Sequence, residues 1–345
     1  MMGHYTGKKL SCLAIGDYMI PSAIFDNMLS SNSLFSHYHS IQWQQGMNGT
    51  RAEFRNVVRQ IEIKGYKAYP VQDDILKAVE DVDVLFLHLF PVPDELIRRA
   101  KRLQYIMTAR GGLENVDIEA ANEFNVKVIN CPEHNALAVA EYTIGLILDE
   151  MRNISRSNMA LKAGTWRERY DNTDVIPELN TSIVGLVGFG VIGRLVAKRI
   201  RAFDAKILVY DPFVDPATIE AYGCIPAVKE ELLRSCDVIS LHARMSKGAA
   251  PVIGTKELSM MKPNAILINT ARAGLVDTHA LYAALKEKKI MGAALDVFPI
   301  EPLPPDYSFL TLDNVTITNH RGGDTLNSYI KAPEILLGKL LKALS

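Results

Sequence analysis

Short apolar runs alternate with segments of helical periodicity along most of the chain. Each run is bounded by glycine, proline or polar residues, which is typical of strands buried on both faces of a parallel sheet. The predicted strands are residues 10–16, 84–89, 106–109, 126–129, 183–187, 206–210, 238–241, 265–268, 292–295 and 315–318. Helices are predicted between them, among them residues 94–103 and 117–124. This alternation predicts an α/β protein whose parallel sheets carry helices on both faces.

Three further segments are predicted to be helical. Residues 135–152 are apolar nearly all round, so the sequence predicts a helix buried on both of its faces. Residues 325–344 have a helical pattern in spite of Pro333, which should kink the helix. Residues 41–60 have a weaker pattern, and a helix is predicted there as well.

Composition narrows the class of protein. The chain has 345 residues, of which 48% are hydrophobic and 22% charged, so two globular domains are expected rather than one. The net charge of −1 favours neither a nucleic acid nor a membrane as partner. Four cysteines form no C-x-x-C pair, and no metal site is predicted. These features are typical of a cytoplasmic protein with reduced, buried thiols.

A glycine-rich turn follows the strand at 183–187. Gly188, Gly190 and Gly193 have the spacing G-x-G-x-x-G, and a helical pattern begins directly after them. The first glycine lets the chain leave the strand, the second admits a pyrophosphate close to the backbone, and the third allows helix and strand to pack. The free N–H groups at the helix start then favour phosphate. The sequence predicts a dinucleotide-binding turn.

An acidic residue ends the next predicted strand. Asp211 lies 23 positions after Gly188, where a carboxylate can accept hydrogen bonds from ribose hydroxyls and repel a 2′-phosphate. We therefore expect NAD rather than NADP.

Three later strands are followed by groups suited to catalysis. Arg272 follows the strand at 265–268, Asp296 and Glu301 follow 292–295, and His320 follows 315–318. Each alone is more often a surface charge, a loop residue or a structural histidine. Ligands of doubly wound sheets bind beyond the carboxyl ends of the strands, so the four together predict an active site there.

The chain resembles the D-isomer-specific 2-hydroxyacid dehydrogenases, such as the D-lactate, D-glycerate and D-3-phosphoglycerate dehydrogenases. The resemblance runs from about Tyr105 to the C-terminus. The blocks that carry it are VKVINCPEHNALAVAEYTIGLIL, VGFGVIGRLVAKRI, ILINTARAGLVDTHAL, GAALDVFPIEP and TNHRGGDT. It implies two doubly wound parallel-sheet domains, a Rossmann NAD domain at 131–320 inserted into a flavodoxin-like substrate domain formed by 1–130 and 321–345. It also implies a homodimer joined through the NAD domains.

The resemblance implies an NAD-dependent oxidoreductase that interconverts a 2-oxo acid and a D-2-hydroxy acid, with Arg272, Glu301 and His320 as its catalytic trio. The cofactor contacts that it implies, with those of the glycine turn, are Gly188, Gly190, Val191, Ile192, Gly193, Asp211, His242, Ala243, Thr270, Ala271, Asp296, Gly322 and Gly323.

Elementary chemistry supports these roles. A guanidinium pairs with a carboxylate through two hydrogen bonds, so Arg272 suits the acid group of a substrate. An imidazole such as His320 can give the developing alkoxide its proton, and an ionised Glu301 beside it favours the imidazolium and fixes its tautomer. Backbone N–H groups of Gly111 and Gly112 are candidates for the substrate carboxylate, with a simple glycine turn as the alternative. Arg110 is a candidate for an anionic substrate tail.

Two other functions share this fold. A formate dehydrogenase is expected to have Gln in place of Glu301, and an NAD-sensing corepressor would keep the same trio. Several positions depart from the family pattern. Residues 85–93 lack an Arg-Ser-x-Thr sequence for phosphoglycerate, Ala273 replaces a glycine, and Arg244 and Arg321 stand where proline and an apolar residue are usual. The sequence therefore does not predict 3-phosphoglycerate as substrate, and it leaves the acid unidentified.

Overall fold

The computed structural model describes residues 9–45, 51–245 and 248–345, which form two compact units. Unit 1 comprises residues up to Asn135 together with Thr325–Ser345, and unit 2 is Ala136–Asp324. Unit 2 is thus inserted into unit 1. The sequence places the two boundaries at residues 130 and 320, compared with 135 and 324 here.

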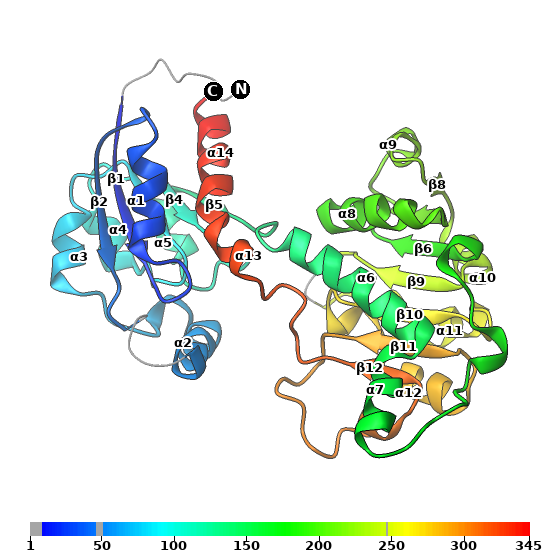
Figure 1. Cartoon of the computed structure of the whole chain (residues 1–345). Coiled ribbons are helices and arrows are strands. Elements are labelled where there is room, and N and C mark those ends of the chain that lie inside the picture. Colours follow the sequence, from blue (N-terminus) through cyan, green and yellow to red (C-terminus); the bar gives the residue numbers. More distant parts are fainter. Residues whose placement is uncertain (1–8, 46–50, 246–247) are drawn as a thin grey trace. The chain divides into compact units, whose positions relative to one another are not determined.

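Unit 1 is built on a five-stranded parallel sheet in the order β2-β1-β3-β4-β5. Its strands are β1 (Leu10–Gly16), β2 (Phe35–Gln42), β3 (Val84–Leu87), β4 (Tyr105–Thr108) and β5 (Lys127–Asn130). Its helices are α1 (Ser22–Ser30), α2 (Arg51–Lys64), α3 (Asp73–Ala78), α4 (Asp94–Arg99), α5 (Ile118–Glu123), α13 (Leu326–Ile330) and α14 (Ala332–Leu344). One apolar core lies under α1 and α14, and a second lies between the other sheet face and α2 to α5 (Figure 1). The order 2-1-3-4-5 is that of flavodoxin-like folds.

Unit 2 is built on a seven-stranded parallel sheet in the order β12-β11-β10-β9-β6-β7-β8. Its strands are β6 (Ile183–Val187), β7 (Lys206–Tyr210), β8 (Ile225–Pro226), β9 (Val238–Leu241), β10 (Ile266–Asn269), β11 (Gly292–Leu295) and β12 (Val315–Ile317). Its helices are α6 (Ala136–Arg152), α7 (Ile154–Lys162), α8 (Val191–Ile200), α9 (Pro216–Ala221), α10 (Lys229–Ser235), α11 (Thr255–Met260) and α12 (Thr278–Lys286). Helices α6 and α8 cover one face of the sheet, and α10, α11 and α12 cover the other. Counted from β6, the strand order reverses between β6 and β9, as in a Rossmann fold.

The prediction of two doubly wound parallel sheets is confirmed, and both sheets have the core on each face. The ten predicted strands and the helices predicted at residues 94–103, 117–124 and 135–152 occur with boundaries shifted by up to four residues. The four cysteines are buried and unpaired. Burial raises the pKa of the Cys131 and Cys236 thiols to about 12. Among the described residues, no helix is both long enough and apolar enough to cross a membrane.

Residues 41–60 do not form one helix. Ile41 and Gln42 end strand β2, and helix α2 begins only at Arg51, while residues 46–50 lie outside the described part of the chain. Strand β2 has the sequence FSHYHSIQ, and most of its side chains are exposed or half-buried. An edge strand of this kind is held by backbone hydrogen bonds to β1 rather than by an apolar run, so hydrophobic periodicity does not detect it.

Two other helix predictions need correction. Helix α6 buries one face, but Leu137, Glu141 and Gly145, at four-residue spacing, are exposed in the single chain. The C-terminal segment is two helices rather than one kinked helix. Helix α13 ends at Ile330, and Pro333 lies in the first turn of α14, where its missing N–H leaves no bond unmade.

Candidate active site

The glycine turn of unit 2 joins β6 to helix α8. Gly188 has φ +98°, and a Cβ there would lie 2.5 Å from the backbone nitrogen of Ala243. At Gly193 a Cβ would lie 2.4 Å from the carbonyl oxygen of Gly188, so helix and strand pack closely. At Gly190 an added Cβ would meet only open space, and Val191 beside it is exposed. The turn therefore presents bare backbone and an uncapped helix start on its outer side.

Asp211 lies directly after β7 and holds the glycine turn by a hydrogen bond to its backbone. Its carboxylate accepts hydrogen bonds from the backbone N–H groups of Phe189 (2.7 Å) and Phe213 (2.9 Å). A carboxylate offers about four acceptor positions, so further hydroxyl donors can still bind it.

Two predicted cofactor residues, His242 and Ala243, follow the neighbouring strand β9. Nε2 of His242 lies 3.0 Å from the hydroxyl of Ser240, and its buried Nδ1 has no hydrogen-bond partner among the described residues. Burial lowers the pKa of His242 to about 4, so the imidazole is neutral at pH 7. His242 thus packs beneath the glycine turn as an uncharged side chain.

The end of β10 positions Arg272. The buried side chain of Asn269 accepts a hydrogen bond from the N–H of Ala271 (3.1 Å) and donates one to the carbonyl of Arg272 (2.9 Å). The Arg272 side chain is exposed. The predicted cofactor residue Thr270 is buried, and its hydroxyl lies 2.8 Å from that of Thr143 on α6. Asn269 was not predicted as a site residue, although a polar residue that ends an apolar strand is a visible signal.

The ends of β11 and β12 hold His320 through Asp296. One Asp296 oxygen accepts hydrogen bonds from the hydroxyl of Thr318 (2.7 Å) and the N–H of Arg321 (2.9 Å). The other accepts from the N–H of Gly322 (2.8 Å). His320 itself has φ +54°, a left-handed conformation that costs a residue with a Cβ about 1–2 kcal/mol. The buried Asp296 carboxylate offsets that cost because its hydrogen bonds fix Arg321 and Gly322, the two residues that follow His320.

His320 and Glu301 form a hydrogen-bonded pair. Nδ1 of His320 lies 2.7 Å from one Glu301 oxygen, and the other oxygen accepts from the N–H of Phe298 (2.9 Å). Because an ionised carboxylate only accepts, Nδ1 carries the proton and Nε2 is left for a substrate. The two side chains are 55% and 36% exposed, so Nε2 is accessible from solvent.

All the predicted residues of unit 2 thus lie at one edge of its sheet, at the carboxyl ends of β6, β7, β9, β10, β11 and β12. Gly322 and Gly323 belong to the loop after β12. Thr318 and Tyr142, which were not predicted, join the Asp296 group, and burial raises the pKa of the Tyr142 hydroxyl. The predicted Arg110, Gly111 and Gly112 follow β4 in unit 1.

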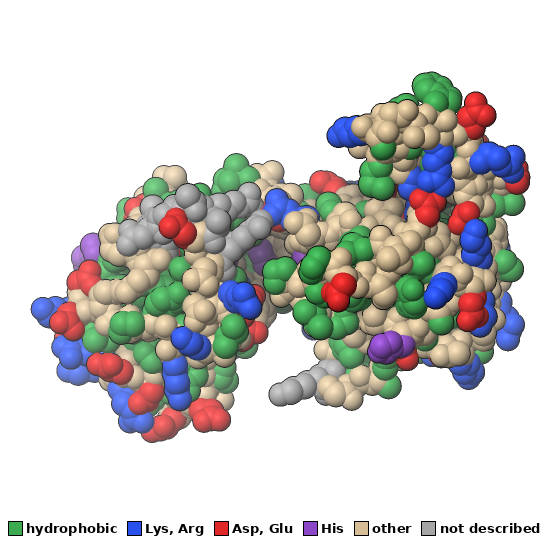
Figure 2. Space-filling view, turned by 90° about the horizontal axis from the view of Figure 1, so that it is seen from below, with side chains coloured by type: hydrophobic (Ala, Val, Ile, Leu, Met, Phe, Trp, Pro, Cys, Tyr) green, Lys and Arg blue, Asp and Glu red, His purple; other side chains and the backbone are tan. Residues whose placement is uncertain are grey.

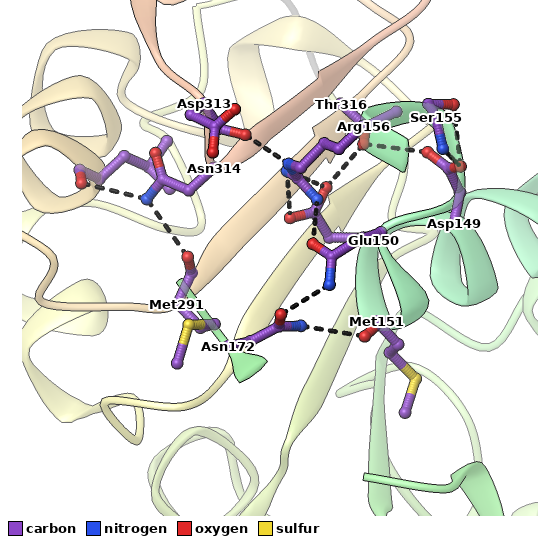
Figure 3. A network of polar contacts seen from close by, with 12 residues as sticks. Asp149, Glu150, Met151, Ser155, Arg156, Asn172, Met291, Asp313, Asn314 and Thr316 are labelled. Carbon is purple, nitrogen blue, oxygen red and sulfur yellow. Dashed lines mark hydrogen bonds and ion pairs between the residues drawn. The ribbon is translucent and has the colours of Figure 1, made fainter. Parts of the chain in front are cut away.

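A second polar group lies at the opposite, amino edge of the unit 2 sheet (Figure 3). Nη2 of Arg156 on α7 donates to both oxygens of Glu150 on α6, at 2.8 and 3.0 Å. Glu150 also accepts from the hydroxyl of Thr316 (2.7 Å), and Nε of Arg156 donates to the carbonyl of Asp313. Burial raises the pKa of Glu150 to about 7, against the lowering effect of Arg156 and Thr316.

Known proteins resemble the chain over most of its length. Residues 144–322 match the family described as D-isomer specific 2-hydroxyacid dehydrogenase, NAD binding domain. D-3-phosphoglycerate dehydrogenase of Methanocaldococcus jannaschii is 39% identical over 277 residues, 79% of this chain and 52% of that protein. Hydroxypyruvate reductase of Thermotoga maritima is 36% identical over 79% of this chain and 88% of its own length. The chain thus spans about half the length of several relatives.

A solved structure agrees in fold. The NAD complex of a D-isomer specific 2-hydroxyacid dehydrogenase from Lactobacillus delbrueckii ssp. bulgaricus superposes with a TM-score of 0.77, at 23% identity and 96% coverage of both chains. At this identity the similarity concerns the fold alone.

Proposed function

Because the chain belongs to the D-isomer specific 2-hydroxyacid dehydrogenase family, we propose that it interconverts a 2-oxo acid and a D-2-hydroxy acid with NAD, using His320 as the general acid and base. The observation that carries this proposal is the 2.7 Å pair between His320 and Glu301, with Nε2 of the histidine accessible. In the direction of oxidation, Nε2 takes the hydroxyl proton of the substrate. In reduction, the same atom returns it to the carbonyl oxygen.

The edge of the unit 2 sheet suits NAD. The open space at Gly190 and the uncapped start of α8 would receive the pyrophosphate, and Asp211 would hold the ribose. A bound NAD or NADH would supply the hydride chemistry at the substrate carbon. The negative charge of Asp211 opposes a 2′-phosphate, which favours NAD over NADP. The other residues predicted to bind the cofactor lie along the same edge and would surround the rest of it. They are Val191, Ile192, His242, Ala243, Thr270, Ala271, Asp296, Gly322 and Gly323.

Arg272 would bind the substrate carboxylate. Its exposed guanidinium follows β10, the neighbour of the strand that leads to Glu301, and Asn269 anchors its backbone. A planar guanidinium can hold a carboxylate through two hydrogen bonds and attract charge that develops on the ketone oxygen.

The decisive experiment is turnover of NADH with a panel of 2-oxo acids. We expect oxidation of NADH with at least one of them, and formation of the D-hydroxy acid. The proton role of His320 has its own signature. Reduction needs the imidazolium and should slow as pH rises, whereas oxidation needs the neutral imidazole and should speed up over the same range. The same pH trend in both directions would contradict the assignment of His320.

We also propose a homodimer that covers the outer side of α6 and α7. Three apolar side chains of this region are among the most exposed of unit 2, namely Trp166 (79%), Met159 (63%) and Ile154 (55%). Figure 2 shows hydrophobic side chains exposed on the face of unit 2 that it displays. Such surface favours burial against a second copy. Light scattering at micromolar concentration should give the dimer mass. Met159→Asp should lower it, whereas Tyr38→Asp in unit 1 should not, and a monomeric wild type would refute the proposal.

A further inference from the structure

Three polar side chains form one row across the carboxyl ends of β10, β11 and β12 in unit 2. The last paired residues of these strands are followed by Thr270, Asp296 and Thr318. Backbone bonds continue the ladder into this row. The N–H of Asp296 donates to the carbonyl of Asn269, and the N–H of Thr318 donates to that of Leu295, each at 3.0 Å. Neighbouring members of the row are therefore about 4.8 Å apart, which is the spacing of adjacent strands.

The row lies on the sheet face that α6 covers. The apolar side chains two residues earlier on β10 and β11 belong to the core under α6, and the side chains of a strand return to the same face at every second residue. Two consecutive residues of α6 bond to the two ends of the row. Thr143 lies 2.8 Å from Thr270, hydroxyl to hydroxyl, and the hydroxyl of Tyr142 is bonded to that of Thr318. One helix thus contacts the row at both ends.

The direction of the Thr270 hydroxyl follows from its partners. A threonine hydroxyl has one hydrogen and two lone pairs. Thr143 gives its hydrogen to the carbonyl of Val139 at 2.8 Å, and a carbonyl can only accept. In the contact between the two threonines, Thr270 is therefore the donor. Its hydrogen points toward α6, and its oxygen, on a residue that is 8% exposed, is left as an acceptor.

Tyr142 orients the hydroxyl of Thr318 in the same way. Thr318 donates its hydrogen to Asp296 at 2.7 Å, and both Asp296 oxygens also accept backbone N–H groups. The bond between Thr318 and Tyr142 is therefore donated by the phenol. The Tyr142 ring also lies against Gly322, where a Cβ would be 3.5 Å from its Cδ1. Asp296 accepts three hydrogen bonds in all, and a carboxylate has about four acceptor positions, so one position is left.

The side chains of the row therefore present acceptors and no hydrogen. Thr270 offers the lone pairs of its oxygen, and Asp296 beside it offers the remaining position of its carboxylate. A ligand that fits these atoms must bring donors and no lone pair of its own. A primary amide group meets this condition, because its nitrogen has two N–H donors and accepts nothing. A ketone or an ether oxygen in the same place would be repelled.

We propose that Thr143 and Tyr142 are positioning residues, which turn the hydroxyl hydrogens of Thr270 and Thr318 inward so that the row accepts the amide N–H groups of the bound cofactor. This inference rests on the proposed function and deepens its cofactor site. Neither α6 residue has to touch the cofactor. Each acts through the threonine to which it is bonded.

A purely structural role of these hydroxyls is the alternative, and β12 offers a matched comparison. The hydroxyl of Thr316, two residues before Thr318, donates to Glu150 on α6 at 2.7 Å. This bond joins the same helix to the same strand, but it lies at the amino edge and has no part in the row. Thr316→Val should therefore lower thermal stability without changing the choice between ligands, whereas Thr143→Val should change that choice.

Binding calorimetry with two dinucleotides tests the proposal. NAD has the amide, and 3-acetylpyridine adenine dinucleotide has a methyl ketone in its place and hence no N–H. The wild type should bind NAD about tenfold more tightly than the ketone analogue. Thr143→Val releases the Thr270 hydrogen, which can then face the ligand as a donor, so the preference for NAD should disappear. Thr143→Ser keeps the hydroxyl and should retain the preference, and Tyr142→Phe should reduce it about threefold. ADP-ribose, which lacks the ring, should bind all these variants equally.

The outcomes separate the positioning role from the cofactor site. Equal affinity of the wild type for NAD and the ketone analogue would overturn the inference, and this measurement needs no variant. An equal loss of both ligands in Thr143→Val, or a lost preference in Thr316→Val, would overturn it as well. If Thr143→Val does not fold, Thr270→Val removes the acceptor itself, and an unchanged preference there would count against the proposal. Failure of both NAD and ADP-ribose to bind the wild type would overturn the proposed function instead.

Discussion

The two edges of the unit 2 sheet each carry an acid paired with a base, but the pairs differ in exposure. At the carboxyl edge, His320 and Glu301 are 55% and 36% exposed, and one imidazole nitrogen is open to solvent. At the amino edge, Arg156 and Glu150 are 7% and 3% exposed, and both Glu150 oxygens are bonded within the protein. An acid–base pair identifies a reactive site only when part of its bonding capacity is left for a ligand.

The residues around the two pairs differ in the same way, with open backbone at the carboxyl edge and close packing at the amino edge. At the carboxyl edge the chain uses bare glycine backbone and a left-handed histidine, which leave space. At the amino edge the chain packs closely against Glu150, since a Cβ at Gly292 would lie 2.2 Å from the Glu150 carboxylate. The amino edge therefore stabilises the junction of α6, α7 and β12, and we expect changes there to alter stability rather than turnover.

The largest expected effect is on turnover, from His320→Asn. Asparagine tolerates the left-handed backbone but cannot carry the proton, so kcat should fall about 10²–10⁴-fold. Thermal stability and the NADH dissociation constant should change little, as checked by calorimetry. His279→Asn, an exposed histidine on α12, serves as the control. Near-normal turnover of His320→Asn would show that the proton comes from another group.

The converse change is Arg156→Met at the amino edge. Removing one partner of a buried pair leaves the other charge uncompensated, so the free energy of unfolding should fall by about 3–5 kcal/mol. The kcat of the folded fraction should stay close to that of the wild type. Arg169→Met breaks an exposed pair with Asp174 and should cost at most about 1 kcal/mol in urea denaturation. If Arg156→Met lowered kcat without lowering the free energy of unfolding, the amino edge would have a role in turnover and the assignment would be wrong.

Asp296→Asn should disturb the carboxyl edge without removing its chemistry. An amide has one acceptor oxygen, so it cannot serve Thr318 and the N–H groups of Arg321 and Gly322 together. We expect the His320 backbone to relax and kcat to fall about 10–100-fold, comparable to the loss of one strong hydrogen bond to a charged group. Steady-state kinetics check this, with Asp215→Asn at the start of α9 as the control. Unchanged kcat would mean that the loop holds His320 without Asp296.

Glu150 should make stability depend on pH. Its pKa rises from an ordinary value of 4.5 to about 7 in the fold, so between these values the folded protein binds the proton more tightly than the unfolded chain. The protonated Glu150 therefore contributes stability at low pH. As pH rises toward 7 this contribution is lost, and the free energy of unfolding falls by up to about 1.4 kcal/mol per pH unit.

The comparison of wild type with Glu150→Gln isolates that dependence. His134 and His242, whose pKa values are lowered to about 4, act in the opposite direction between pH 4 and 6.5 in both proteins. Urea denaturation at several pH values between 5 and 8 should give a difference in stability that varies with pH only up to about 7. A difference that stays constant would show that Arg156 keeps Glu150 ionised throughout.

The smallest effect concerns the choice of cofactor. Asp211→Asn keeps an acceptor for Phe189 N–H but removes the negative charge that repels a 2′-phosphate. The preference for NADH over NADPH, measured as a ratio of kcat/KM values, should narrow about tenfold. An unmutated protein that already uses NADPH equally well would refute the cofactor assignment.

Local rules in the sequence determined the two parallel sheets and the edge at which the cofactor is proposed to bind. The G-x-G-x-x-G spacing identified Gly188, Gly190 and Gly193 because strand, turn and helix are adjacent in the chain. Strand ends predicted that Arg272, Glu301 and His320 follow strands at one edge of the sheet, because parallel strands align their carboxyl ends. Strand β2 escaped detection because backbone bonds to β1, rather than an apolar pattern, hold it.

Only the tertiary structure decided which polar groups remain free. Asp17 and His88 are 71 residues apart, and Asp296 and Gly322 are 26 apart, so no local pattern shows that they are bonded to each other. In the sequence Glu150 and Glu301 are equally acids near the ends of elements. In the fold, Glu150 is buried and paired with Arg156, whereas Glu301 is partly exposed and paired with His320. Reactivity depends on the bonds that a group has left over, and those are counted only once distant segments have packed.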